Sequence, residues 1–102
     1  MAYTPLVQIA WDQAKNLANQ QKHGLSFERA CELFRPGVRY LEIFDEEHSF
    51  TEDRFIAIGP IRRGLVVVIW TDRDDDTIRI IGAPWATKHE QTLYRNHVGE
   101  TL

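Results

Sequence analysis

The hydrophobic residues of this chain are most concentrated at residues 65–70, six consecutive apolar positions rich in β-branched side chains. Six residues is a usual length for a strand and too short for a core helix. A half-exposed strand would alternate apolar and polar residues, so the unbroken run predicts a strand that is buried on both faces. We therefore expect residues 65–70 to lie in the middle of a sheet that other elements cover.

Segments on both sides of this run also have strand patterns. They are residues 6–11, 38–44, 54–61 and 77–83. The connections at 62–64 and 72–76 are short and polar, and Gly64 can adopt a positive φ, so both are typical of hairpin turns. In the last strand, alternation predicts Arg79, Ile81 and Ala83 on one side. Together these segments predict an antiparallel meander of about four to five strands.

Three helices are predicted at the two ends of the chain. Asp12 is a good N-cap for a helix over residues 13–22, and Gly24 is a typical C-terminal stop. The apolar residues of this helix form a narrow stripe, namely Ala14, Leu17 and Ala18. Ser26 precedes a second helix whose apolar positions follow the i, i+3, i+4, i+7 pattern, namely Phe27, Ala30, Cys31 and Phe34. A capping box at residues 87–90 begins a third helix through about residue 97. The element order predicts an α+β layered fold.

Composition limits the classes of protein to which the chain can belong. At 102 residues, with 43% hydrophobic and 26% charged positions, it is expected to be one domain over residues 1–102. No apolar run approaches the roughly 20 residues that span a bilayer. A single cysteine, Cys31, cannot form an internal disulfide, which favours the reducing cytoplasm. The net charge of −3 argues mildly against a dedicated nucleic-acid binder, although arginines gather near the strands.

No cofactor or metal motif is apparent. The four histidines are scattered without Cys or carboxylates at ligand spacing, and the six glycines are dispersed through turns. We therefore predict neither a metal nor a cofactor.

Three short features carry candidate chemistry. Lys22 and His23 end the first helix, where a basic C-cap is the simpler interpretation. Glu52 and Arg54 lie at the mouth of a strand, where a surface ion pair is the alternative. Arg79 is a charge within an apolar strand, either an open-face arginine or one that meets phosphate. A His, a Glu and several cations on an open sheet would be able to cleave RNA through the ribose 2′-hydroxyl, because that reaction needs proton transfer and stabilisation of a pentavalent phosphorane.

A longer ordered set of residues carries a family resemblance. It comprises Trp11, Asp12, Lys15, Asn16, residues 22–28, Ala30, Asp45, His48, residues 52–55, Ile58, Gly59, residues 64–68 and 78–81, Ala83, Ala86, Glu90 and Tyr94. This set covers about residues 8–94 and resembles the BrnT family of toxins. The resemblance implies a RelE-like fold and a metal-independent ribonuclease toxin of a type II toxin–antitoxin pair that inhibits translation and growth. It also implies neutralisation by a small BrnA-like DNA-binding antitoxin, with which the toxin forms a hetero-oligomer. The toxin would reach operator DNA only through this antitoxin.

The resemblance transfers catalytic roles to five positions: Lys22, His23, Glu52, Arg54 and Arg79. In this interpretation His23 or Glu52 transfers protons, while the three cations hold phosphate. Trp85 and Lys88 are candidate RNA-binding residues, with core or partner packing as the alternative for Trp85.

One departure from the family pattern affects the expected activity. Where the family usually has Ser-Ala-Arg after the last strand, this chain has Gly82-Ala83-Pro84. Loss of that arginine leaves Lys88 or Arg79 to supply the cation. The alternative function is therefore a degenerate toxin that only binds the antitoxin and acts as a co-repressor.

Overall fold

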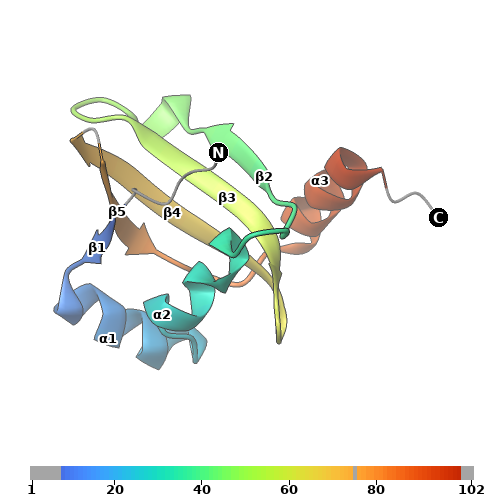
Figure 1. Ribbon diagram of the computed structural model, residues 1–102, viewed down its shortest axis with the longest axis horizontal. Coiled ribbons are helices and arrows are strands. Elements are labelled where there is room, and N and C mark those ends of the chain that lie inside the picture. The colour runs from blue at the N-terminus through green and yellow to red at the C-terminus, as the bar shows by residue number, and fades with distance from the viewer. Residues whose placement is uncertain (1–7, 75, 100–102) are drawn as a thin grey trace.

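The computed structural model describes residues 8–74 and 76–99, and it contains one sheet with helices on both faces (Figure 1). The elements in chain order are β1 (Gln8–Trp11), α1 (Gln13–His23), α2 (Phe27–Ala30), the 3-10 turn η1 (Cys31–Phe34), β2 (Leu41–Phe44), the 3-10 turn η2 (Glu46–His48), β3 (Arg54–Ile61), β4 (Gly64–Asp74), β5 (Thr77–Gly82) and α3 (Lys88–Val98). The predicted α+β class is confirmed.

The sheet has the strand order β1-β5-β4-β3-β2. Strands β2 to β5 form the predicted antiparallel meander, with β4 in the middle. The first strand differs, because β1 pairs in parallel with β5. A parallel neighbour requires a long crossover connection, whereas the four meander strands follow one another through short links. The sheet therefore joins the first and last strands of the chain.

Several element boundaries differ from the sequence prediction. Strand β2 begins at Leu41 rather than at residue 38, strand β5 ends at Gly82 rather than at residue 83, and residues 6 and 7 of the first predicted strand lie outside the described residues. The second helix has α geometry only over Phe27–Ala30 and continues as the 3-10 turn η1. Strand β4 extends to Asp74, so the segment expected as a turn at 72–76 belongs partly to the strand, and residue 75 lies outside the described residues. Helix α3 begins with both bonds of the predicted capping box.

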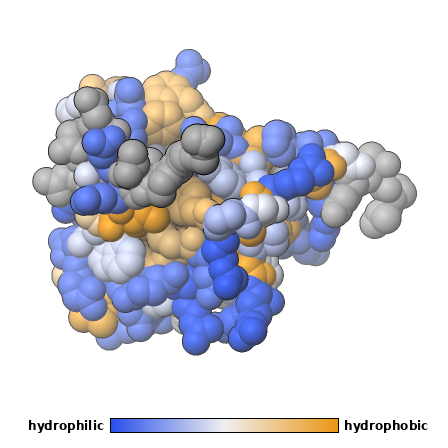
Figure 2. Space-filling view, in the orientation of Figure 1, coloured by the Kyte–Doolittle hydropathy of each residue, from blue (hydrophilic) through white to orange (hydrophobic). Residues whose placement is uncertain are grey.

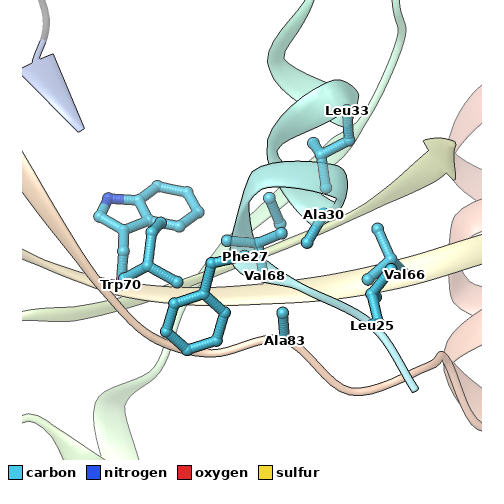
Figure 3. Packing of buried hydrophobic residues seen from close by; sticks show 10 residues of the cluster. Leu25, Phe27, Ala30, Leu33, Val66, Val68, Trp70 and Ala83 are labelled. Carbon is cyan, nitrogen blue, oxygen red and sulfur yellow. The ribbon is translucent and has the colours of Figure 1, made fainter. Parts of the chain in front are cut away.

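The two faces of the central strand are both covered, as its apolar run predicted. On one face, side chains of the α2 region pack against β4 (Figure 3). The α2 region contributes Leu25, Phe27, Ala30 and Leu33, and β4 contributes Val66, Val68 and Trp70. On the other face, a smaller cluster joins the sheet to α3 and consists of Ile58, Val67, Ala86 and Tyr94. Helix α3 lies mainly against β2 and β3, whereas α1 contacts β5.

The predicted side of Ala83 was wrong. Ala83 is fully buried in the α2-side cluster with Ile80, rather than on the side of Arg79 and Ile81. The reason is an irregularity in the β4–β5 ladder, where Trp70 pairs with Ile80 but Ile69 pairs with Gly82. The extra residue reverses the alternation of the chain beyond it.

The predicted apolar stripe of α1 was also wrong. Leu17 is 52% exposed, and the buried residues of α1 are Asn16 and Asn19. The outer surface of α1 and α2 is mostly hydrophilic in Figure 2. Hydrogen bonds take the place of apolar packing in holding this helix.

Two buried asparagines make those hydrogen bonds. Asn16 Oδ1 accepts from the Phe27 backbone N–H at 2.8 Å, and Asn16 Nδ2 donates to Glu28 Oε1 at 2.9 Å. The Asn19 amide donates to the carbonyls of Leu25 and Ala83 at 2.9 and 3.0 Å, and its oxygen accepts from the Ala83 N–H at 3.1 Å. Helix α1 is thereby fastened both to the start of α2 and to the segment that follows β5.

Candidate active site

A row of polar side chains crosses the sheet on the face opposite α2. Arg54 of β3 is paired with Thr71 of β4, which is in turn paired with Arg79 of β5. Trp70 belongs to the α2-side cluster, so its neighbour Thr71 and the residues paired with Thr71 project from the other face. Register therefore places two arginines from segments 25 positions apart on the same face of the sheet.

These residues line a cavity of about 220 Å³, here called the first hollow. Its lining residues are Lys15, His48, Thr51, Glu52, Arg54, Thr71, Arg79 and Ile81. Three of the five residues predicted to be catalytic, Glu52, Arg54 and Arg79, thus lie around one cavity.

The cations of the first hollow are not neutralised by neighbouring side chains. Within the described residues, the one ion pair closer than 4.0 Å joins His48 to Asp45, so Lys15, Arg54 and Arg79 have no carboxylate partner there. The Arg54 Nε is buried and has no hydrogen-bond partner in the described part of the chain. A buried donor without an acceptor reduces the stability of the fold. Groups that meet a ligand often lack a partner in this way, because the ligand supplies it.

Asp45 and His48 form a dyad at the rim of this hollow. His48 Nδ1 lies 2.8 Å from Asp45 Oδ2, and the Asp45 side chain is only 14% exposed while the His48 side chain is 57% exposed. An Nδ1–H that donates to the carboxylate leaves the lone pair of the neutral ring on Nε2. The dyad can therefore present an oriented base to the cavity.

The other two predicted catalytic residues lie beside this cavity rather than in it. Lys22 and His23 line a second hollow of about 470 Å³. The other lining residues of the second hollow are Lys15, Ala18, Asn19, Ile69, Ile81, Gly82 and Pro84. Lys15 and Ile81 line both hollows, so the two are adjacent. Pro84, the departure from the family pattern, is one of the residues that line the second hollow.

The two candidate RNA-binding residues are placed differently. Trp85 packs against the α2-side cluster, and its Nε1–H donates to the His23 carbonyl at 2.9 Å. The Arg63 guanidinium lies over the Trp85 ring, 5.4 Å from its centroid. Lys88 is the first residue of α3 and lines neither hollow. The structure thus gives Trp85 packing contacts, and it does not bring Lys88 to the candidate site.

Sequence reasoning omitted Lys15 and His48 from the site. Lys15 belongs to the set of residues that resembles the family, but it is one of two exposed lysines on a polar helix, and no periodicity or spacing marked it as a site residue. His48 had a signal, because its i, i+3 spacing from Asp45 permits the observed pair.

Two absences can be stated for the described residues. No three of their His, Cys, Asp and Glu side chains gather as a metal site would require. None of their helices is long and apolar enough to cross a membrane.

Comparison with known proteins identifies the family. A model described as "Ribonuclease toxin, BrnT, of type II toxin-antitoxin system" matches residues 11–90, which is more than half of the chain. The chain belongs to the BrnT family. The resemblance noted in the sequence is thereby confirmed, and with it the general assignment to ribonuclease toxins of type II toxin–antitoxin systems.

A solved structure shows the same fold. The Brucella abortus ribonuclease toxin BrnT, determined at 1.1 Å resolution, matches with a TM-score of 0.61 and 23% sequence identity. The match covers 80% of this chain and 99% of the Brucella chain. A comparison with curated proteins found no match. This BrnT family member therefore shares the toxin fold with a distant relative.

Proposed function

We propose that this BrnT family member is an endoribonuclease that cleaves RNA at the first hollow, by attack of a ribose 2′-hydroxyl on the adjacent phosphate. The observation that carries the proposal is the convergence of Lys15, Arg54 and Arg79 on one cavity. They come from α1, β3 and β5, and none of them is paired with a carboxylate of the described residues. Unpaired cations brought together from three elements fit a ligand that carries negative charge on several oxygens.

These cations suit the transition state better than the bound phosphodiester. The pentavalent phosphorane carries more negative charge than the substrate, so fixed cations stabilise it preferentially. A guanidinium can donate two parallel hydrogen bonds to phosphate oxygens. The buried, unpartnered Nε of Arg54 supports this role, since a phosphate oxygen would supply its acceptor.

Two proton transfers complete the reaction. A base removes the proton of the 2′-hydroxyl as its oxygen bonds to phosphorus, and an acid protonates the 5′-oxygen as the P–O5′ bond breaks. The products are a 2′,3′-cyclic phosphate and a 5′-hydroxyl. Glu52 and the Asp45–His48 dyad are at the same cavity as the cations, so we assign the proton transfers to them. His23, in the second hollow, is placed beside the reacting groups rather than among them.

The proposal has two further parts, the absence of a metal requirement and the identity of the partner. Side-chain cations would act where other nucleases use a divalent metal, so cleavage is expected without added metal. Family membership implies an antitoxin partner; we propose a BrnA-like DNA-binding antitoxin that forms a hetero-oligomer with this chain in the cytoplasm, neutralises it, and carries it to operator DNA.

Induced expression in a bacterial host tests the proposal, with growth and RNA integrity followed with and without the neighbouring gene. Growth arrest with RNA cleavage, relieved by the neighbour, is the expected result. Arg79→Ala should abolish cleavage while leaving the melting temperature nearly unchanged. The matched control is Arg95→Ala, since Arg95 is exposed on α3 and lies outside both hollows. Unfolding of Arg79→Ala would instead make Arg79 a structural residue.

A second candidate function is supported by one observation. Pro84 places an uncharged ring in the wall beside Lys22 and His23, at the position where an arginine was expected. In this alternative the chain binds the antitoxin and acts as a co-repressor without cleaving RNA. Normal growth and intact RNA from a folded, antitoxin-binding protein would establish it, and recovery of cleavage in Pro84→Arg would identify the cause.

A further inference from the structure

We propose that the second hollow is a nucleobase subsite, which receives the base of a nucleotide joined by the phosphate that the first hollow holds. This inference rests on the proposed nuclease function and deepens it, because it assigns how the RNA is gripped beside the reacting bond. Its occupant is one base, held by packing rather than by reading of its edges.

The position of the hollow is the first argument. Lys15 and Ile81 line both hollows, so a ligand that fills the first at its phosphate continues directly into the second. The two hollows are thus adjacent. A base attached to the adjoining sugar is the part of RNA that such a neighbour would meet.

The chemistry of the walls is the second argument. Ile69, Ile81 and Pro84 give apolar walls, and Lys15 and Lys22 supply positive charge at the same hollow. An apolar interior with cations beside it matches a flat aromatic base whose backbone carries negative charge. The volume of about 470 Å³ is within the range of small-molecule sites.

The polar atoms of the wall indicate packing rather than base-edge readout. Asn19 uses its amide on the carbonyls of Leu25 and Ala83 and its oxygen on the Ala83 N–H. The Pro84 carbonyl accepts from the Val67 N–H at 2.9 Å. Because these groups are already bonded, the polar side chains left to meet a base edge are those of Lys15, Lys22 and His23. Stacking on the apolar face that every base has should therefore contribute more than contacts to base edges.

The hollow can be filled from α1 without altering the reacting groups. Ala18 of α1 is exposed and lines the hollow, so Ala18→Leu replaces a methyl group with an isobutyl group in the space that the base would occupy. Ala14, one turn earlier on α1, is also exposed but lines neither hollow. Ala14→Leu is therefore the matched control, with the same substitution in the same helix.

A second variant approaches from the sheet. A Cβ on Gly82 would lie 3.7 Å from the Ile69 Cδ1, an ordinary contact, and Gly82 does not have a positive φ. Gly82→Ala is thus expected to fold normally while narrowing the hollow. Because the two variants change different elements, α1 and β5, an effect on the fold that is particular to one substitution would not appear in the other.

The experiment uses hexanucleotides that contain a single ribonucleotide in a 2′-deoxy chain, so that one phosphate alone can be cleaved. Matched substrates lack the base of the ribonucleotide or of its 3′ neighbour. For the wild-type protein we expect loss of one of these bases to lower kcat/KM by about fivefold or more, the low end for one stacked base. Ala18→Leu should remove that dependence, cleaving the intact and abasic substrates at the same rate, whereas Ala14→Leu should retain it. Exchange of one base for another should change the rate less than removal does.

Binding of the all-deoxy hexanucleotide separates this inference from the nuclease proposal. If the wild-type chain binds but does not cleave, and its affinity falls on base removal in the wild type but not in Ala18→Leu, the subsite stands and the nuclease function fails. If cleavage is insensitive to removal of either base, the subsite is refuted while the nuclease stands. Unchanged base dependence in Ala18→Leu also refutes the subsite. If Ala18→Leu weakens antitoxin binding while RNA cleavage is unaffected, the subsite is likewise refuted, because the hollow would then receive the partner protein.

Discussion

Asn19→Ala removes three buried hydrogen bonds that hold α1 against the rest of the fold. The Asn19 side chain is 8% exposed and bonds the carbonyls of Leu25 and Ala83 and the N–H of Ala83. A typical intramolecular hydrogen bond contributes about 1 kcal/mol, and a buried group left without its partner costs about 1–3 kcal/mol. Alanine regains roughly 0.5 kcal/mol through its higher helix propensity. We expect a net loss of about 3 kcal/mol in the free energy of unfolding.

Thermal and urea unfolding followed by circular dichroism measure this loss. For a domain of this size, about 3 kcal/mol corresponds to a fall of roughly 12–24 °C in melting temperature. Asn96→Ala is the control, since Asn96 is an exposed asparagine within α3 and its side chain makes no hydrogen bond within the described residues. Asn19→Asp keeps the shape and the acceptor but turns the donor into an oxygen that faces two carbonyls, so it should also destabilise. A change below about 1 kcal/mol for Asn19→Ala would show that the asparagine bonds do not hold α1 in place.

Three further predictions concern other parts of the fold. Gly59→Ala should destabilise strongly, because its Cβ would lie 2.8 Å from the Tyr40 Cβ; a melting temperature equal to that of the wild type would contradict this contact. Burial raises the pKa of Cys31 to about 12, so at pH 8 iodoacetamide should alkylate the native protein far more slowly than the urea-unfolded chain. Because the pKa is higher in the folded than in the unfolded state, the neutral thiol favours folding below about pH 9, and that contribution should be lost as the pH rises towards 12. Thr87→Ala removes one bond of the capping box, the one in which the Thr87 hydroxyl accepts from the Glu90 N–H. It should lower the free energy of unfolding in urea by about 1 kcal/mol, with Thr92→Ala as an exposed control on the same helix.

Local signals accounted for most of the fold and for part of the site. The β-branched run at 65–70 and the turn at 62–64 were enough to predict the central hairpin, since both signals act between near neighbours. Arg79 could be singled out because a charge in an apolar strand is conspicuous. Lys15 could not be, because its place beside Arg79 depends on the parallel pairing of β1 with β5, a contact between distant segments that no periodicity reports.

The errors in α1 and β5 have specific physical causes. A periodicity search assumes that apolar residues face inward, but α1 buries Asn16 and Asn19 instead of Leu17, since free backbone groups at Leu25, Phe27 and Ala83 require partners. Ala83 was assigned to the wrong side because one irregular step in the β4–β5 ladder reverses the alternation. Both effects depend on three-dimensional contacts.

The pairing of β1 with β5 also determines when the candidate site exists during synthesis. The hairpins of the meander form from neighbouring segments, but the bond from Asn19 to Ala83 closes across 64 positions, and Lys15 likewise waits for Arg79. At about 5–20 residues per second, the ribosome needs roughly 3–13 s to make the chain between them. A nascent chain whose β5 is still inside the ribosome therefore contains Lys15 but not yet all three cations of the first hollow. On the proposed function, the growing polypeptide would remain harmless to the RNA around it until most of its own sequence has been translated.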